Sequence, residues 1–277
     1  MKKIDLHVHT TASDGTVSPA EAAELAAEKG LAAIAITDHD TVLGVREAAD
    51  RAGELGIELV PGIEISTKFK AAVHILGYYI DLDAAPLREV SDWVVRDRDE
   101  RNGAIAALMA ADGLPVSYEQ MHRRFGPVIG RPHFAELLVE LGLADSMKDA
   151  FQRYMERGQK YYLPRTILPL DRAIETVTSS GGTAVLAHPF QYRLDDGGLR
   201  ELIERCMELG VTGMECRYSG YGPTQTAYLE ALAGEYGLLP IGGSDFHGSH
   251  KPQIQLGLGQ DEGVPYQWLQ DLKDARR

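Results

Sequence analysis

The chain has 277 residues, of which 44% are hydrophobic and 25% are charged, and its formal net charge at pH 7 is −13. This length and composition suit one large α/β domain or a core domain that carries an insertion. The acidic balance excludes broad, non-specific binding to duplex DNA, which needs an extended basic surface. It leaves room for an anionic substrate, because bound divalent cations can reverse the local charge.

No apolar run approaches the ~20 residues that a membrane-spanning helix needs. Residues 1–5 lead into a predicted strand without an apolar signal region, so we expect a cytoplasmic protein without a membrane partner. Cys206 falls in a predicted helix and Cys216 in a predicted strand. We therefore expect buried free thiols, and neither a disulfide nor a thiolate metal site.

The first part of the chain alternates short apolar strands with helices. A strand is predicted at 4–10, and the next helix begins after Ser18, where Glu21 completes a capping box, and ends at Gly30. The other elements predicted up to residue 80 are three strands and one helix, at 31–36, 57–60, 73–80 and 41–55. Such alternation is typical of a β/α fold.

The pattern changes after residue 84. From 85 to about 162 the chain is nearly all helical in pattern, and the charged run at 96–101 is most simply a solvent-facing helix surface. We therefore divide the chain into three predicted segments. They are a first barrel part at 1–84, a helical insertion or cap at 85–165, and a second barrel part at 166–277.

Alternation of strands and helices resumes from residue 170. The predicted strands are 183–187, 211–216 and 238–241, and the predicted helices are 171–180, 199–209 and 223–236. Repeated units of this kind predict a parallel sheet with helices outside it, and about seven strands are enough to close a barrel. The predicted fold class is therefore α/β, a (β/α) barrel with a helical insertion.

Two histidines in the first predicted strand, His7 and His9, lie one residue apart. Side chains alternate faces along a strand, so both imidazoles point to the same side and can bind one metal ion. Asp14, just past the next turn, can reach the same ion or a neighbouring one. A chain with nine histidines also contains such a pair by chance, so the interpretation depends on further ligands.

Further ligand-type side chains fall in other predicted strands or beside their ends. They are His39, Glu64, His74, His188, Asp245 and His247. The C-terminal strand ends of a β/α barrel meet at one face, so these side chains should converge there. Each alone would more simply be a structural residue, but their coincidence predicts a metal centre. The donors are nitrogen and oxygen only, which suits zinc, manganese or iron.

Together these motifs resemble the PHP (polymerase and histidinol phosphatase) family. The matching segments are His7-x-His9 with Asp14, residues 37–40 (Thr-Asp-His-Asp), residues 61–64 (Pro-Gly-Ile-Glu), His74, residues 187–189 (Ala-His-Pro) and residues 244–247. The resemblance implies a distorted seven-stranded (β/α) barrel that holds two to three divalent metal ions. It also implies a metal-dependent phosphoesterase.

The resemblance further implies how the ligands are shared. The residues implied for a first metal are His7, His9, Glu64 and Asp245. Those implied for a second metal are Glu64, His74 and His188, and those for a third are Asp14, His39 and His247. Glu64 is expected to bridge the first two metals, and Glu64 and Asp245 are thereby predicted to be catalytic.

The predicted insertion resembles that of small bacterial PHP phosphoesterases, among them 3′,5′-nucleoside bisphosphate phosphatases and relatives that trim short RNA from the 5′ end. The resemblance rests on residues 131–135 (Arg-Pro-His-Phe-Ala). Arg131 is predicted to bind a substrate phosphate, and His133 to bind phosphate or, as a catalytic acid, to protonate the leaving group. Both could instead be structural residues of the insertion. Lys160 is a further candidate for phosphate binding.

Those enzymes often continue the His-Pro motif with Gly-Arg-Tyr, whereas residues 190–192 here are Phe-Gln-Tyr, and Arg193 is the candidate to replace the missing arginine. We predict hydrolysis of a phosphomonoester of a small nucleotide, either a 3′,5′-nucleoside bisphosphate or an AMP-like compound. The implied chemistry is attack of a metal-activated hydroxide on phosphorus. The 5′ ends of short RNA are a further expected substrate.

Three alternatives remain open from the sequence. A histidinol-phosphate phosphatase would share every metal ligand, although residues 131–133 argue against it. An amidohydrolase would need a bridging lysine after a middle strand, where this chain has Glu64. A non-catalytic metal-binding regulator or polymerase-accessory module would be favoured by the loss of a ligand, and none is missing.

Overall fold

The computed structural model describes residues 2–125, 129–164, 166–258 and 263–276. In it the chain forms two compact units. One comprises Met1–Val90 with Ile167–Arg277, and the other comprises Ser91–Thr166. All strands of the described chain belong to the first unit. The predicted limits of the insertion, 85 and 165, lie close to this division, which helix α3 (Ala85–Ala111) crosses.

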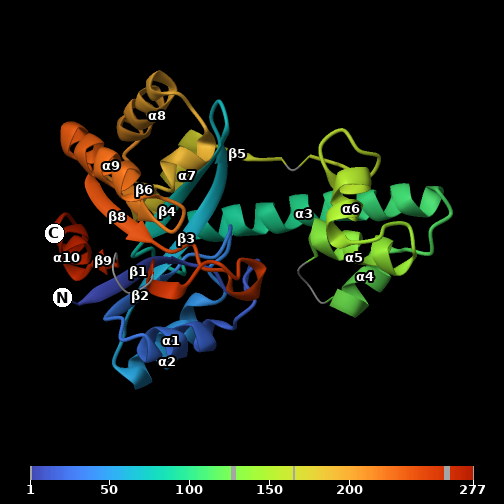
Figure 1. Cartoon of the computed structure of the whole chain (residues 1–277), viewed down its shortest axis with the longest axis horizontal. Helices are drawn as coiled ribbons and strands as arrows, with labels where there is room; N and C mark the ends of the chain where they lie inside the picture. Colours follow the sequence, from blue (N-terminus) through green and yellow to red (C-terminus); the bar gives the residue numbers. More distant parts are fainter. Residues whose placement is uncertain (1, 126–128, 165, 259–262, 277) are drawn as a thin grey trace. The chain divides into compact units, whose positions relative to one another are not determined.

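Seven strands form the wall of a barrel in the first unit (Figure 1). In sheet order they are β8 (Leu239–Gly243), β7 (Gly213–Tyr218), β6 (Thr183–Leu186), β4 (Ala72–Tyr78), β3 (Glu58–Lys68), β2 (Ala33–Ile36) and β1 (Lys3–Val8). Two-residue strands, β9 (Val264–Pro265) and β5 (Leu168–Pro169), pair with β1 and β3.

The barrel is nearly closed where the end of β1 meets the chain beyond β8. Val8 forms a parallel bridge with Phe246, and the N–H of His9 donates to the carbonyl of Phe246 at 2.9 Å. The N–H of Asp245 donates in turn to the carbonyl of His7, also at 2.9 Å. The predicted (β/α) barrel is thereby confirmed, and its closure joins the first and last ligand-bearing segments.

The predicted direction of one strand was wrong. β4 runs antiparallel to both β3 and β6, whereas the alternation of strands and helices predicted a parallel sheet. The reason lies in the connection, because residues 69–71 alone join β3 to β4. So short a turn makes a hairpin and cannot make the crossover that a parallel neighbour requires. The hairpin accounts for the distortion of the barrel.

Helices lie on the outside of this sheet (Figure 1). They are α1 (Pro19–Glu28), α2 (Val45–Leu55), α7 (Leu170–Ser179), α8 (Asp196–Glu208), α9 (Pro223–Tyr236) and α10 (Tyr266–Asp274). The first begins as predicted, because the Ser18 hydroxyl accepts the N–H of Glu21 and the Glu21 carboxylate accepts the N–H of Ser18. This capping box satisfies backbone N–H groups at the helix start.

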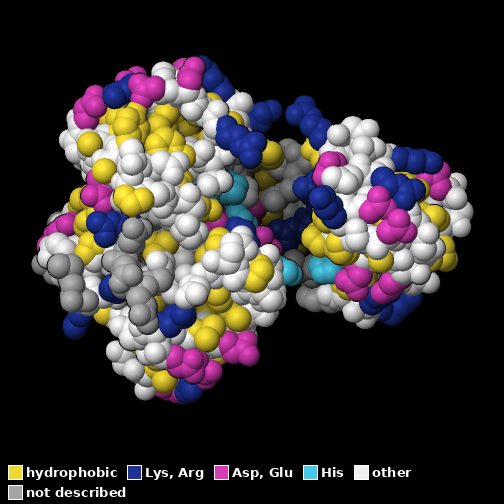
Figure 2. Space-filling view, viewed as in Figure 1, with side chains coloured by type: hydrophobic (Ala, Val, Ile, Leu, Met, Phe, Trp, Pro, Cys, Tyr) yellow, Lys and Arg dark blue, Asp and Glu magenta, His cyan; other side chains and the backbone are white. Residues whose placement is uncertain are grey.

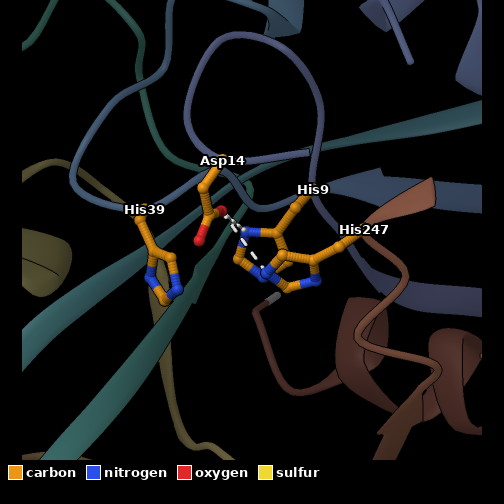
Figure 3. A group of neighbouring side chains, drawn as sticks. All are labelled: His9, Asp14, His39 and His247. Atoms are coloured by element: carbon orange, nitrogen blue, oxygen red, sulfur yellow. Dashed lines mark ion pairs between the residues drawn. The ribbon is translucent and has the colours of Figure 1, made fainter. Parts of the chain in front are cut away.

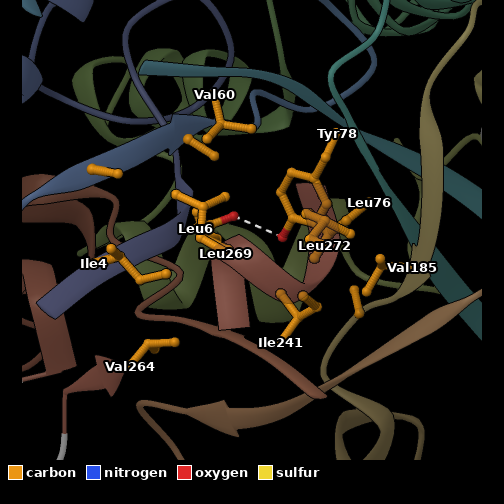
Figure 4. Close-up of a cluster of buried hydrophobic side chains, with 13 residues drawn as sticks. Ile4, Leu6, Val60, Leu76, Tyr78, Val185, Ile241, Val264, Leu269 and Leu272 are labelled. Atoms are coloured by element: carbon orange, nitrogen blue, oxygen red, sulfur yellow. Dashed lines mark hydrogen bonds between the residues drawn. The ribbon is translucent and has the colours of Figure 1, made fainter. Parts of the chain in front are cut away.

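Apolar side chains from the strands and from α10 fill the barrel interior (Figure 4). Fully buried members include Ile4, Leu6, Val60, Leu76, Ile241, Leu269 and Leu272. The hydroxyl of Tyr78 on β4 donates to the carbonyl of Leu6 on β1 at 2.8 Å. Each large apolar side chain buried here contributes about 1.5–3 kcal/mol. Core packing therefore fixes the backbone directly beside His7.

The second unit is helical and has a core of its own. Its elements are most of α3, with α4 (Tyr118–Phe125), α5 (Arg131–Glu140), α6 (Met147–Ala150) and the π-helical turn η1 (Phe151–Met155). Ile105, Met109, Phe134 and Leu138 are among its buried side chains. The segment predicted as a helical insertion therefore forms helices in the described residues.

Two simpler predictions concern membranes and thiols. In the described ranges, no helix is both long enough and apolar enough to cross a membrane. Cys206 on α8 and Cys216 on β7 are buried free cysteines, as predicted. Burial raises the pKa of the Cys206 thiol to about 12, so the thiol stays protonated at neutral pH.

Candidate metal centre

All nine predicted metal ligands come together at one end of the barrel. They are His7, His9, Asp14, His39, Glu64, His74, His188, Asp245 and His247, and they fall into four overlapping groups of nearby ligand atoms. Strand geometry explains the convergence, because β1, β2, β6 and β8 end at this face and the β3–β4 hairpin crosses it.

Glu64 on β3 lies at the middle of the cluster and is fully buried. Its Oε2 is 3.3 Å from Nε2 of His7, 3.2 Å from Nε2 of His9 and 3.0 Å from Nδ1 of His39. The Nε2 atoms of His7 and His9 are themselves 3.1 Å apart, so the two imidazoles aim at one point. This is the same-side placement that the H-x-H spacing predicted.

The other oxygen of Glu64 faces a second pair of imidazoles. Oε1 is 2.8 Å from Nδ1 of His74 and 2.9 Å from Nε2 of His188. The register of the β3–β4 hairpin explains the first contact, since Ser66 pairs with His74 and Glu64 lies two residues along on the same face. One carboxylate thus separates two sets of nitrogen donors.

Asp245, just beyond β8, presents one oxygen to the cluster and has the other fully engaged. Its Oδ1 lies 3.2 Å from Nε2 of His9 and 3.6 Å from Nε2 of His7. Its Oδ2 accepts the hydroxyl of Tyr218 and the ammonium of Lys251, both at 2.7 Å. The backbone φ of +57° at Asp245 lies in the left-handed region, which aspartate tolerates better than most residues.

A third group combines His9 with three residues from separate loops (Figure 3). Asp14 Oδ1 is 3.3 Å from Nε2 of His247 and 3.7 Å from Nδ1 of His9. The rings of His9 and His247 stack with centroids 4.1 Å apart, and His39 completes the group. The Asp14 side chain is 54% exposed, so this group is the most accessible to solvent.

Electrostatics within the cluster keep the central carboxylate charged and one imidazole neutral. Burial alone would raise the pKa of Glu64, but the surrounding imidazoles hold it well below its usual range. Burial and the neighbouring imidazoles His9 and His74 lower the pKa of His39 to about 3, against the attraction of Glu64. The result is an ionised carboxylate beside a neutral nitrogen donor, which are the protonation states that metal ligation needs.

The residues present fit divalent metal ions. Within the described part of the chain, four atoms of the cluster are buried without a hydrogen-bond partner, namely His9 Nδ1, His39 Nδ1, Glu64 Oε2 and His188 Nδ1. Buried polar atoms are rarely left unpaired, and each of these lies on a metal-ligand type of side chain. Six imidazoles with three carboxylates form a donor set suited to zinc, manganese or iron.

The cluster is not wholly covered by its own unit. The side chains of His39 and His74 are 22% and 26% exposed, and Figure 2 shows histidine side chains at the surface of the barrel unit. A substrate can therefore reach the ligands without unfolding of the barrel.

Sequence reasoning missed the buried carboxylates that support the ligands. Glu215 on β7 is fully buried, lies 3.1 Å from Nδ1 of His7 and accepts the backbone N–H of His188 at 2.7 Å. Asp38 accepts the N–H and the hydroxyl of Thr10, both at 2.7 Å, and so ties the end of β1 to that of β2. A carboxylate inside the predicted strand at 211–216, as Glu215 is, was the available signal.

Four further residues were predicted to contact the substrate, one in the first unit and three in the second. Arg193 is exposed at the end of the 3₁₀ turn η2 (Pro189–Tyr192). The remaining three, Arg131, His133 and Lys160, belong to the second unit. Arg131 donates to the carbonyl of Met155 at 3.3 Å, and the N–H of Gly130 donates to Nδ1 of His133 at 2.9 Å. Lys160 pairs with Asp112 at 2.7 Å.

Imidazole and carboxylate ligands clustered at the mouth of a β/α barrel define a metal-dependent hydrolase. Comparison with protein families gives a match to the PHP domain over residues 5–156. The chain belongs to the PHP family, and it is a metal-dependent phosphoesterase, as its motifs predicted. The non-catalytic alternative is thereby set aside.

Relatives that match most of the chain are named for several activities on phosphoesters. The chain is 38% identical to the 5′-3′ exoribonuclease Rnm of Escherichia coli K12, over 99% of this chain and 96% of the relative. It is 31% identical to a 3′,5′-nucleoside bisphosphate phosphatase of Chromobacterium violaceum, over 94% and 93% of the two chains. A phosphoribosyl 1,2-cyclic phosphate 1,2-diphosphodiesterase of Eggerthella lenta is 30% identical, over 88% and 94%.

Two solved structures share the fold over nearly their full length. A metal-dependent phosphoesterase structure from Bifidobacterium adolescentis matches with a TM-score of 0.82 at 30% identity, covering 99% of this chain and 96% of that one. A C. violaceum structure, described as an amidohydrolase with bound sulfate and no metal, matches with a TM-score of 0.81 and the same identity and coverage. In this chain the middle of the cluster holds Glu64, where the amidohydrolase interpretation requires lysine.

Proposed function

We propose that this enzyme hydrolyses a phosphomonoester of a 3′,5′-nucleoside bisphosphate or an AMP-like nucleotide, and that it accepts the 5′ ends of short RNA. The names of two relatives support this substrate class, because one is a nucleoside bisphosphate phosphatase and another a 5′-3′ exoribonuclease. Both names describe hydrolysis of phosphoesters in nucleotides. One kind of metal centre can catalyse both reactions, since each breaks a phosphoester bond.

The position of Glu64 carries the proposal. One of its oxygens faces His7 and His9, and the other faces His74 and His188. We therefore assign Glu64 as the bridge between a first metal, completed by Asp245, and a second metal. Asp14, His39 and His247, with His9 beside them, form the third set. Zinc, manganese and iron are the proposed ions.

Divalent ions bound here would lower the pKa of water and offset the charge that builds up on phosphoryl oxygens. The chain's own contribution is orientation and charge balance. Three carboxylates, Asp14, Glu64 and Asp245, offset only part of the charge of two to three such ions. A phosphate dianion is then attracted into a pocket of an otherwise acidic protein. Tyr218 and Lys251 hold Asp245 so that its Oδ1 faces the cluster.

We further propose substrate contacts for the residues that the sequence motifs indicated. Arg131 has a guanidinium suited to bidentate phosphate binding, and His133 can donate a proton to the leaving alkoxide. Lys160 and Arg193 are proposed as additional phosphate contacts. The exposed ammonium of Lys160 pairs with Asp112 at 2.7 Å, and such a pair is weak enough to exchange for a phosphate.

The test is phosphate release from 3′,5′-adenosine bisphosphate by the metal-loaded protein. We expect His9→Ala to abolish release while His122→Ala, a histidine of α4 in the second unit, retains it. Equal turnover by His9→Ala and the unmodified protein would contradict the metal assignment. Histidinol phosphate is assayed in parallel, and faster release from it than from nucleotides would favour the histidinol-phosphate phosphatase alternative.

A further inference from the structure

A cavity of about 340 Å³ lies beside the metal centre in the barrel unit, between β7 and α9. Its wall includes Arg217, Tyr218, Tyr221, Thr226, Ala227 and Glu230. This volume is within the range of about 300–1,000 Å³ that is usual for small-molecule sites. None of these residues is among the nine metal ligands, so the cavity needs an explanation of its own.

Tyr218 forms the partition between the cavity and the centre. Its ring lines the cavity, its hydroxyl donates to Oδ2 of Asp245 at 2.7 Å, and its centroid lies 5.5 Å from that of His188. A molecule in the cavity would therefore be one side chain away from two proposed ligands. That separation suits a substrate that carries a phosphate on one side and a second group on the other.

The walls suit a flat, uncharged group. The rings of Tyr218 and Tyr221 lie with centroids 5.0 Å apart and tilted by 48°, which gives the cavity an aromatic side. Aromatic side chains of this kind bind nucleobases by stacking. The hydroxyl of Thr226 and the carboxylate of Glu230 offer hydrogen-bonding groups to the edge of such a ring.

The charges of the cavity argue against a second phosphate site. The guanidinium of Arg217 is paired with Glu230, Nε to Oε1 at 3.0 Å, and donates to the carbonyl of Gly263 at 3.1 Å. It also lies over the ring of Trp268, 4.8 Å from its centroid. Because Glu230 offsets the charge of Arg217, this part of the wall has no surplus positive charge for an anion.

We propose that this cavity binds the nucleobase of the substrate, while the phosphate lies at the metal centre. The inference rests on the proposed nucleotide phosphoesterase function and adds a specificity site to it. Binding the base beside Asp245 fixes the position of the attached phosphate, so nucleotides are preferred over phosphate esters that lack a base.

The first experiment measures binding without metals or turnover. Adenosine and uridine, which carry no phosphate, are added to the chelator-treated full-length protein, and binding is followed by saturation-transfer NMR. Ala227→Trp places an indole in the cavity, and Ala231→Trp makes the same change at an exposed position one helical turn along α9 that does not line the cavity. We expect Ala227→Trp to weaken nucleoside binding at least fivefold and Ala231→Trp to leave it unchanged. Equal binding by the two variants would overturn the proposal.

The second experiment measures selectivity in the metal-loaded enzyme. The ratio of kcat/KM for 3′,5′-adenosine bisphosphate to that for 1-deoxyribose 3,5-bisphosphate, which lacks the base, should fall at least fivefold in Ala227→Trp and not in Ala231→Trp. An unchanged ratio with active enzyme refutes the base site and leaves the proposed function intact. Absence of turnover on either compound by the unmodified enzyme refutes the proposed function, while nucleoside binding still tests the cavity.

Discussion

Oε1 of Glu215 lies 3.1 Å from Nδ1 of His7, and both side chains are fully buried. A carboxylate in this place accepts the Nδ1–H and leaves the Nε2 lone pair, which faces His9 and Glu64, free to bind a cation. The other oxygen of Glu215 accepts the backbone N–H of His188 at 2.7 Å. One residue of β7 thus orients two proposed ligands from different strands.

Glu215→Gln tests this orienting role. The amide keeps the size of the side chain but loses the charge, so we expect metal affinity to fall about 10–100-fold. Affinity is measured by competition with a fluorescent chelator, together with metal content after dialysis. Glu235→Gln, an exposed residue paired with Arg200, is the matched control and should bind metal normally. Full metal affinity in Glu215→Gln would show that the contact is only structural.

The metal-free protein should lose stability as the pH rises. Burial lowers the pKa of His9, but hydrogen bonds with Asp245 and Glu64 outweigh it and raise that pKa to about 9. Because this pKa is raised in the folded state, protonated His9 contributes fully to the free energy of unfolding below pH 6.5. This contribution is lost as the pH passes through about 9. The pKa values of Asp14 and Asp245 are lowered, so both carboxyls are ionised throughout this pH range. They therefore do not change how the free energy of unfolding depends on pH here.

Calorimetry of chelator-treated and metal-loaded protein measures this effect. We expect the Tm of the chelated protein to fall by on the order of 5 °C between pH 6.5 and pH 9. The loaded protein should show no such fall, because metal displaces the proton from His9 and binding releases protons. Parallel pH dependence of the two forms would contradict the protonation of His9 in the metal-free state.

How far the sequence predicts the metal centre differs from ligand to ligand, because some positions are set by local spacing and others by the fold. The side-chain period of a strand is local, so His7 and His9 could be placed on one face from spacing alone. The barrel then predicted convergence of the strand ends, and Asp245 does lie just beyond β8. Glu64 instead lies within β3 and reaches the cluster because the β3–β4 hairpin crosses that face. The direction of β4 could have been predicted from the short connection at residues 69–71, which allows only an antiparallel hairpin. The general alternation of strands and helices favoured a parallel strand instead.

Residues whose function depends on contacts across the barrel could not be given a role from the sequence alone. Glu215 has no motif partner near it in the chain, and its role becomes evident only from its contacts with the side chain of His7 and the backbone of His188. The cavity lined by Tyr218 and Tyr221 likewise depends on how α9 packs against β7. Arg131 and His133 were proposed from a short motif, and their roles stay predictions.

The two cysteines should be unreactive in the native protein. Burial raises the pKa of Cys206 to about 12, and burial together with neighbouring carboxylates raises the pKa of Cys216 as well. The thiolate is the reactive form, so a disulfide reagent at pH 8 should modify neither thiol in the folded protein. Both should react once guanidinium unfolds the chain. Rapid modification of one thiol in the native state would contradict its burial.

The approach of β8 to β1 is close enough that a single methyl group should disturb the metal centre. A Cβ added at Gly243 would lie 2.3 Å from the Cβ and 2.4 Å from the backbone nitrogen of His7. Gly243→Ala must therefore push the two strands apart, and we expect it to cost about 1–3 kcal/mol of unfolding free energy and to lower metal content.

Gly234→Ala is the matched control for this change. Gly234 lies inside α9, and a Cβ added there meets nothing within 4 Å. Alanine in a helix is favoured over glycine by about 0.5–1 kcal/mol, so this variant should be more stable than the unmodified protein and bind metal normally. Urea unfolding and metal analysis of both variants check the pair. If Gly243→Ala matched Gly234→Ala in either measurement, the close contact of β8 with His7 would not govern the site.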